Sequence, residues 1–189
     1  MMAVSAQATK INVAIAVWEW PSYFDPEQKM QGIKLDIAKW RRPSPDCGPV
    51  LAKAAGLYMI CTLSKHEAER QGYSESLMLD HEGNVAESTS ANIFFKDSNG
   101  ELHTPIPDCF LDGITRRTVI DIAKSKNIKV HERKISPNEL PNFVGCFLTG
   151  TAAEITPVSK IAENNYKVCD LIIDLSSSYG KLVRKKKAA

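Results

Sequence analysis

The stretch Thr149-Gly150-Thr151-Ala152-Ala153-Glu154-Ile155-Thr156-Pro157-Val158 decides the fold class, because it reverses the chain between two apolar segments. Residues 146–149 and 154–161 are predicted to be strands that flank a turn at Gly150. The small residues after the glycine leave successive backbone N–H groups uncovered, which suits the binding of an anion such as a carboxylate. The simpler alternative is a tight hairpin that binds nothing.

Outward from this turn, segments with strand patterns alternate with segments of helical spacing. Apolar, β-branched residues predict a buried strand at 11–18, and alternation predicts a half-buried strand at 33–40. Three prolines make 41–49 a loop. Apolar residues at helical spacing then predict a helix at 50–71, with Gly72 where a C-terminal cap belongs.

The remaining elements mix hairpins with helical connections. Strands are predicted at 76–80, 85–96, 101–104 and 128–134, and helices at 113–126 and 169–184. The fold class is therefore α/β, with a mixed sheet or pseudo-barrel flanked by helices rather than a doubly wound parallel sheet.

Composition excludes several classes of protein. The 189 residues suit one domain, and an apolar fraction of 43% with 24% charged residues is ordinary for a soluble globular protein. A net charge of +2 does not indicate nucleic acid, and the basic run at 184–187 is interpreted as a solvated tail. We predict no membrane span and no targeting segment.

The cysteines and histidines indicate neither disulfides nor a metal. The five cysteines are an odd number and form no C-x-x-C pair, and the four histidines lack metal-ligand spacing. We therefore predict a reduced, cytoplasmic compartment and no metal.

Three further stretches carry candidate chemistry, each with an ordinary structural alternative. Ala52-Lys53-Ala54-Ala55-Gly56-Leu57-Tyr58 surrounds a lysine with small residues that leave room for a bulky group, and an apolar setting favours the free amine of Schiff-base chemistry. Glu87-Ser88-Thr89-Ser90-Ala91-Asn92 puts a carboxylate where it could pair with a pyridinium nitrogen. Leu111-Asp112-Gly113-Ile114-Thr115-Arg116 opens a helix whose free N–H groups suit a phosphate. The alternatives are a surface lysine, a turn-flanking glutamate and an ordinary helix start.

Taken together and in this order, the four stretches resemble the class IV fold of pyridoxal-phosphate enzymes, and most closely the branched-chain amino acid aminotransferases. The resemblance extends over nearly the whole chain, with most weight on 53–80, 110–124 and 147–158. The segment Trp40-Arg41-Arg42-Pro43-Ser44-Pro45 also matches relatives, and no role is assigned to it.

The resemblance implies a pyridoxal 5′-phosphate cofactor and roles for four residues around its ring. Lys53 would form the Schiff base and move the proton during catalysis. Tyr58 would hydrogen-bond the phenolic oxygen, and Glu87 would hold the pyridinium proton, which makes the ring an electron sink. Leu111 would pack on a face of the ring.

The same resemblance implies a phosphate site and a substrate site. Gly113 opens the helix at which Ile114 and Thr115 would hold the phosphate, with Thr151 adding a donor. Thr151 and Ala152 would present N–H groups to the substrate carboxylate, and Trp20 would lie near the substrate side chain. The implied reaction moves the amino group of leucine, isoleucine or valine to 2-oxoglutarate.

The resemblance also implies a domain layout and partners. Residues 1–10 form an N-terminal segment, expected to be disordered, 11–182 the large cofactor-binding domain, and 183–189 a basic tail. The family's smaller N-terminal domain, about a hundred residues long, is missing from this chain, which exposes apolar surface and favours self-association. The predicted partners are an amino acid, a 2-oxo acid and a second copy of the chain, since the family is dimeric, without nucleic acid or membrane.

Three alternatives stay open from the sequence. The chain could be a truncated, non-catalytic remnant that binds the cofactor without turnover. It could have a sister class IV activity, as a D-amino acid aminotransferase or an aminodeoxychorismate lyase. It could also bind nucleic acid through the basic tail.

Overall fold

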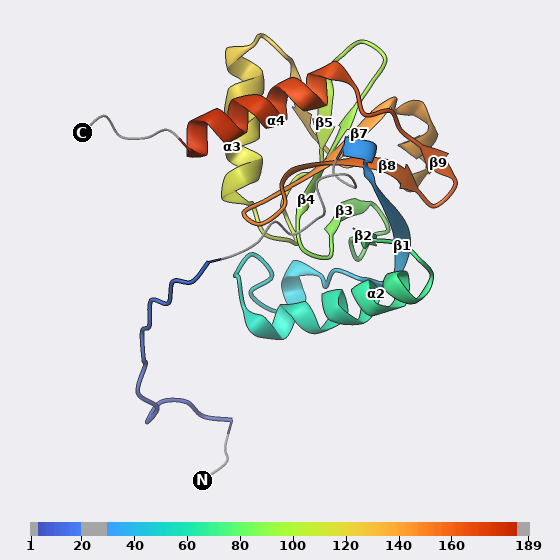
Figure 1. The fold of residues 1–189 in the computed structure, drawn as a ribbon. Helices are drawn as coiled ribbons and strands as arrows, with labels where there is room; N and C mark the ends of the chain where they lie inside the picture. The colour runs from blue at the N-terminus through green and yellow to red at the C-terminus, as the bar shows by residue number, and fades with distance from the viewer. Residues whose placement is uncertain (1–3, 20–29, 185–189) are drawn as a thin grey trace, which may run out of the picture.

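The computed structural model describes residues 4–19 and 30–184, which contain a curled, nine-stranded mixed sheet with helices on its outside (Figure 1). The strands follow the order β3-β2-β1-β8-β7-β4-β5-β6, with β9 on β8. The strands are β1 (Ile33–Arg41), β2 (Glu75–Leu79), β3 (Val85–Ser88), β4 (Asn92–Lys96), β5 (Leu102–Thr104), β6 (Val130–Glu132), β7 (Gly145–Gly150), β8 (Glu154–Ile161) and β9 (Asn164–Asn165). The predicted α/β class, with a mixed sheet or pseudo-barrel flanked by helices, is confirmed.

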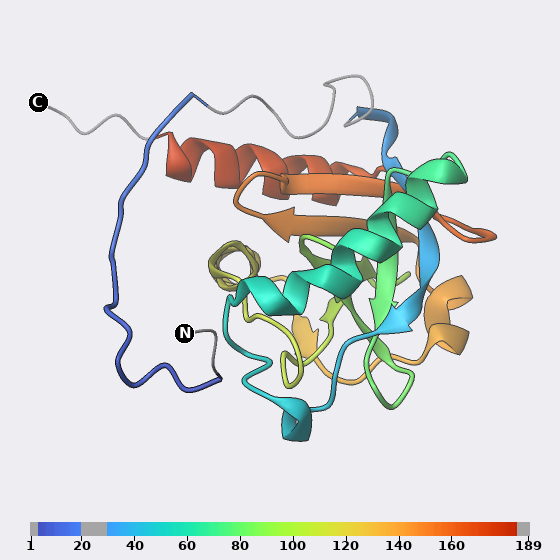
Figure 2. The ribbon, with the colours of Figure 1, turned by 90° about the horizontal axis from the view of Figure 1, so that it is seen from below.

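Helices cover two separate parts of this sheet. The helices are α2 (Met59–Arg70), α3 (Ile114–Ser125) and α4 (Asp170–Val183), and the 3-10 turns are η1 (Pro45–Cys47), η2 (Ala55–Tyr58) and η3 (Pro137–Asn142). Helix α2 packs on β1 and β2, whereas α3 and α4 lie together against β7 and β8. Figure 1 shows α2 below the sheet and the α3–α4 pair above it, and Figure 2 gives the same ribbon seen from below.

Strand alternation divides the core between the two faces of the sheet. Phe94 and Phe147 stack at 5.0 Å and join the cluster under α3 and α4. Their neighbours Phe95 and Leu148 point the other way, into a cluster enclosed by the curl of the sheet. Both clusters are buried, so the middle of the sheet is apolar on both faces.

Strand β1 lies between two parallel neighbours, β2 and β8. Parallel pairing requires long connections, which the turn η2 with α2 supplies between β1 and β2. The hairpin β7–β8 predicted from the opening stretch is present, with Gly150 opposite Glu154. Gly72, predicted as the C-terminal cap glycine, follows the end of α2 at Arg70 and adopts φ +82°.

The predicted strand at 11–18 is wrong. These residues have no regular secondary structure, and Ile11, Val13, Ile15 and Val17 are 88–93% exposed. Figure 1 shows the segment running away from the sheet. None of the described strands pairs with it, and an apolar alternation forms a strand only where a neighbour supplies hydrogen bonds.

Two other boundaries differ from the predictions. The helix expected from residue 50 begins at Met59, because Ala54 has an extended backbone and η2 intervenes. The strand expected over 85–96 is two strands, β3 and β4. The Ser88 hydroxyl accepts hydrogen bonds from the N–H groups of Ser90 and Ala91, which turns the chain between them.

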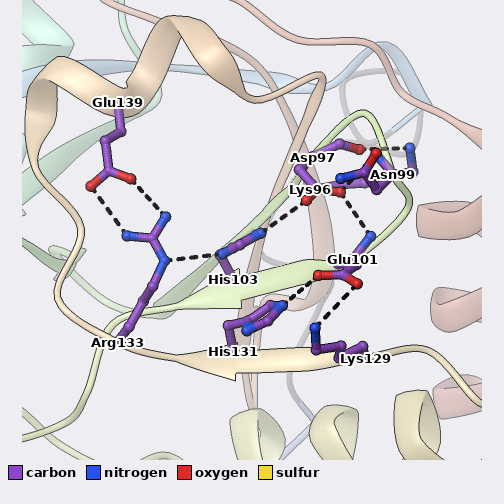
Figure 3. A network of polar contacts seen from close by, with 9 residues as sticks. All are labelled: Lys96, Asp97, Asn99, Glu101, His103, Lys129, His131, Arg133 and Glu139. Atoms are coloured by element: carbon purple, nitrogen blue, oxygen red, sulfur yellow. Dashed lines mark hydrogen bonds and ion pairs between the residues drawn. The ribbon is translucent and has the colours of Figure 1, made fainter.

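A network of charged side chains covers the β5–β6 edge of the sheet (Figure 3). The rings of His103 and His131 stack at 4.7 Å, and Arg133 pairs with Glu139 at 2.7 Å while donating to His103 at 3.1 Å. Glu101 pairs with both His131 and Lys129. Charged groups at a sheet edge oppose pairing with another strand, so this network protects the edge.

No helix in ranges 4–19 and 30–184 combines the length and apolar character that a membrane crossing requires.

Adjacent residues on α4 give a matched test of the core. Ile172 is fully buried under the sheet, whereas Ile173 is 55% exposed. Ile172→Ala should lower the free energy of unfolding by about 2–5 kcal/mol because it leaves a cavity. Ile173→Ala should change it by less than about 0.5 kcal/mol. Urea unfolding of both variants measures the difference, and equal losses would contradict the described packing of α4.

Candidate active site

Eight of the ten site residues predicted from the sequence line one cavity of about 160 Å³. Its walls come from the end of β1, the turn before α2, the β3–β4 connection, the start of α3 and the end of β7. The lining residues are Arg42, Ala52, Lys53, Leu57, Tyr58, Cys61, Glu87, Thr89, Ser90, Ala91, Asn92, Leu111, Gly113, Ile114, Thr115, Thr149, Gly150 and Thr151. Five segments that are distant in sequence thus share one concave site, the usual form of a small-molecule site.

Lys53 and Tyr58 bring an amine and a phenol together at this cavity. The Lys53 amine donates a hydrogen bond of 2.8 Å to the Tyr58 hydroxyl. Both residues belong to the turn before α2, and η2 brings them together across five positions. The apolar surroundings expected for Lys53 are not found, since its side chain is exposed and its hydrogen-bond partner is a phenol. The amine is therefore accessible from the cavity and oriented by one contact.

Glu87 supplies a buried carboxyl to the same cavity. It is 8% exposed, and its Oε1 lies 3.4 Å from the Nε of Arg42. Burial raises the pKa of Glu87 from an ordinary 4.5 to about 8, against the opposing attraction of Arg42 and Lys53. The carboxyl is thus suited to a positively charged partner, which would favour its ionised form.

The start of α3 forms a third wall with free backbone donors. The cap residue Gly113 offers no side chain, so no side chain caps the first N–H groups of the helix. The amide of Asn92 clasps this turn, donating to the Leu111 carbonyl at 2.9 Å and accepting from the Gly113 N–H at 3.2 Å. Asn92 therefore fixes the helix start relative to β4.

Thr115 and Ile114 differ in how they face the site. Thr115 is 4% exposed, and its hydroxyl lies 3.3 Å from that of Tyr179 on α4. The Ile114 side chain is 76% exposed although the residue lines the cavity. The structure therefore gives the Thr115 hydroxyl a partner other than the phosphate expected from the sequence, while the backbone at this helix start stays available for an anion.

The turn after β7 forms the fourth wall. Thr151 lines the cavity, whereas Ala152 lies one residue beyond its lining. The Thr149 hydroxyl is buried and has no hydrogen-bond partner among the described residues. Trp20, predicted near the substrate side chain, lies outside the described residues.

A buried carboxylate holds the β3–β4 connection in place behind the cavity. Glu75 is fully buried and accepts hydrogen bonds from the Thr89 hydroxyl and, at 2.9 Å, from the Ser90 hydroxyl. The Lys65 amine lies 3.4 Å from the same carboxylate. Thr89 and Ser90 line the site, so Glu75 holds two lining residues in place without lining the cavity itself.

Arg42 and Cys61 line the cavity but lie outside the four candidate stretches of the sequence, and Asn92 and Thr149 lie within those stretches without a predicted role. Arg42 stands in the Trp-Arg-Arg-Pro match, but the sequence does not show which arginine turns inward. Asn92 ends a predicted stretch, and its clasp of Gly113 joins residues far apart in the chain. Within 4–19 and 30–184, no group of three or more His, Cys, Asp and Glu is arranged to hold a metal ion.

Comparison with known proteins identifies the protein family of the chain. The family model described as Amino-transferase class IV matches residues 3–161. The chain therefore belongs to the class IV aminotransferase family. Within that family, the proteins it resembles include several that are named branched-chain-amino-acid aminotransferases.

Two relatives illustrate the similarity in sequence. A Rickettsia felis protein named "Probable branched-chain-amino-acid aminotransferase" is 42% identical over 164 residues, which cover 84% of this chain and 56% of that protein. The branched-chain-amino-acid aminotransferase of Escherichia coli K12 is 38% identical over 151 residues, 79% of this chain and 48% of that protein. The chain thus spans about half the length of the curated relatives it matches.

Two solved structures show the same fold. The Escherichia coli branched-chain amino acid aminotransferase has a TM-score of 0.83 at 33% identity, with 87% of this chain and 55% of that chain covered. An aminotransferase from Brucella abortus, bound to the cofactor PLP, has a TM-score of 0.76 at 30% identity, with coverage of 80% and 54%.

The raised pKa of Glu87 predicts a pH-dependent stability for the cofactor-free chain. Since the folded-state pKa of about 8 exceeds the ordinary 4.5, the folded chain binds the extra proton between these values. This contribution is fully present below the unfolded pKa and is lost as the pH rises through about 8. Between pH 5 and 9 the unfolding free energy of the wild type should fall by roughly 3–5 kcal/mol because of Glu87. Glu87→Gln should lack this part of the fall. Urea unfolding with Glu163→Gln as control tests this, and parallel curves for wild type and Glu87→Gln would contradict it.

The clasp at Gly113 predicts a strict requirement for glycine. A Cβ at this position would lie 2.3 Å from the Asn92 Oδ1, so Gly113→Ala must displace the Asn92 amide. The variant should lose about 1–3 kcal/mol of unfolding free energy through overpacking. Gly56→Ala is the matched control, because nothing lies within 4 Å of its added Cβ. Equal stability of Gly113→Ala and wild type would show that the clasp does not constrain the turn.

Proposed function

We propose that the cavity binds pyridoxal 5′-phosphate and that Lys53 is its covalent partner. One observation carries the proposal: a single cavity holds an amine hydrogen-bonded to a phenol, a buried carboxyl, and an uncapped helix start. An amine for the aldehyde, an acid for the ring nitrogen and backbone donors for the phosphate are the contacts that this cofactor requires. Solved family members with pyridoxamine 5′-phosphate and with PLP support the same assignment.

The residues present fit that group in chemistry and in placement. The buried Thr149 hydroxyl has no hydrogen-bond partner among the described residues, and no side chain caps the first N–H groups of α3. These groups can donate hydrogen bonds to an acceptor such as a phosphate. Gly113, Ile114, Thr115 and Thr151 would hold the phosphate, and Leu111 would pack on the ring. The proposed cofactor-binding domain is residues 11–182.

Pyridoxal phosphate, when bound, supplies an aldehyde for amines and a ring that withdraws electrons from the carbon bearing the amine. Glu87 would hold a proton at the ring nitrogen, since a cation beside a buried carboxylate favours the ionised acid. Tyr58 orients the Lys53 Nζ through the 2.8 Å hydrogen bond. Lys53 is then placed to take the proton from the substrate Cα.

We further propose that the reaction transfers the amino group of leucine, isoleucine or valine to 2-oxoglutarate. The names of the relatives support this substrate class. The turn at Thr151 and Ala152 would direct backbone N–H groups at the substrate carboxylate.

Borohydride reduction in the presence of pyridoxal phosphate tests the covalent partner. The wild-type chain should gain one phosphopyridoxyl mass on the peptide that contains Lys53, and Lys53→Ala should lose it. Lys129→Ala, at an exposed lysine paired with Glu101, controls for nonspecific labelling of surface amines. Labelling spread equally over many lysines, unchanged in Lys53→Ala, would contradict the proposal.

Turnover then tests the substrate. L-Leucine with 2-oxoglutarate should yield glutamate in the wild type and none in Lys53→Ala. Turnover of D-alanine without L-leucine would instead indicate a sister activity. Labelling of Lys53 without any turnover would indicate a binding protein.

A further inference from the structure

Arg42 joins the two chemically distinct sides of the cavity. Its backbone N–H donates to the Leu79 carbonyl at 2.8 Å, which fixes the residue at the end of β1. Its guanidinium is buried, with Nη1 donating to the Leu57 carbonyl at 3.2 Å and to the Cys61 sulfur at 3.5 Å. The Nε lies 3.4 Å from the Glu87 carboxylate. One side chain thus touches the acid and the turn that carries the lysine–tyrosine pair.

The Nε of Arg42 approaches Glu87 as a charge rather than as a well-formed hydrogen bond. This buried Nε makes no hydrogen bond within the described residues. The ion pair therefore acts through charge at short range, in a setting where water does not screen it. Leu57 precedes Tyr58, so the second contact of Arg42 restrains the backbone next to the phenol that holds Lys53.

The neighbouring arginine has none of these contacts. Arg41 is exposed, and its Nη1 donates to the His81 carbonyl at 3.4 Å, away from the cavity. Two consecutive arginines of the same strand end therefore differ in burial and in partners, which makes Arg41 an internal control for charge and strand position.

We propose that Arg42 is a positioning residue that draws the Glu87 carboxyl toward its ionised form and aims it into the cavity while it fixes the turn bearing Tyr58. The inference rests on the proposed function, because it assigns to Arg42 the control of the acid that would face the ring nitrogen. The charged or titratable groups around Glu87 are Arg42 just after β1, Lys53 from the turn and Cys61 from α2. Lys53 is exposed, so solvent weakens its pull, and Arg42 is the buried cation of the set.

The test follows the titration of Glu87 in the cofactor-free chain by carbon NMR of a ¹³C-labelled sample. The Cδ resonance of Glu87 is identified by its absence in Glu87→Gln. In Arg42→Gln the titration should move to higher pH by roughly one pH unit or more, since a nearby arginine lowers a carboxyl pKa by about that much. Arg41→Gln should titrate as the wild type does. An unchanged titration in Arg42→Gln would overturn the proposal.

Arg42→Lys keeps the inference testable if the glutamine variant does not fold, because breaking a buried ion pair can unfold a chain. The lysine variant retains the positive charge, so Glu87 should titrate near its wild-type pH. A titration displaced to higher pH in Arg42→Lys would show that charge at this position does not hold the carboxylate, and would also overturn the proposal.

A second readout separates positioning from simple structural support. Arg42→Gln should bind pyridoxal phosphate about tenfold more weakly than Arg41→Gln, by loss of a charge-assisted interaction. Equal binding by the two variants would contradict the positioning role. The Glu87 titrations need no cofactor, so a failure of Lys53 labelling would count against the proposed function alone and leave the Glu87 result to be judged separately.

Discussion

The parallel pairing of β1 with both β2 and β8 is the constraint on which the structure depends. It joins the two halves of the curled sheet, and its end delivers Arg42 into the cavity. Parallel neighbours force a long connection after β1. That connection contains Lys53, η2 and α2, so the strand that organises the sheet also determines where the reactive amine can lie.

Opposite charges meet in the wall of the cavity. A buried carboxyl, a buried guanidinium and an accessible amine share one concave space, and another buried carboxylate, Glu75, supports the wall formed by the β3–β4 connection. Unbalanced buried charge is costly, so an arrangement of this kind persists where a ligand completes it. An electron-poor ring with a phosphate would add a cation beside Glu87 and an anion beside the start of α3.

The fold, and most of the residues that line the cavity, could be predicted from the sequence because both depend on local patterns. The glycine turn at 150, the helix opening at Gly113 and the alternation of β1 each lie within about ten residues. The strand at 11–18 was predicted wrongly because a strand depends on its partner. Arg42 and Asn92 were missed because their roles come from contacts with Glu87 and Gly113, which only the folded chain brings near. The roles of individual site residues stay predictions.

Hydrogen–deuterium exchange of the chain with and without pyridoxal phosphate tests the central claim most directly, that distant segments form one cofactor site. Exchange should slow on binding in four regions together: 53–58, 87–92, 113–116 and 149–152. The β5–β6 edge with its histidine pair should exchange at the same rate in both states. Protection confined to the Lys53 region, or absent from all four, would contradict a shared cavity as the site.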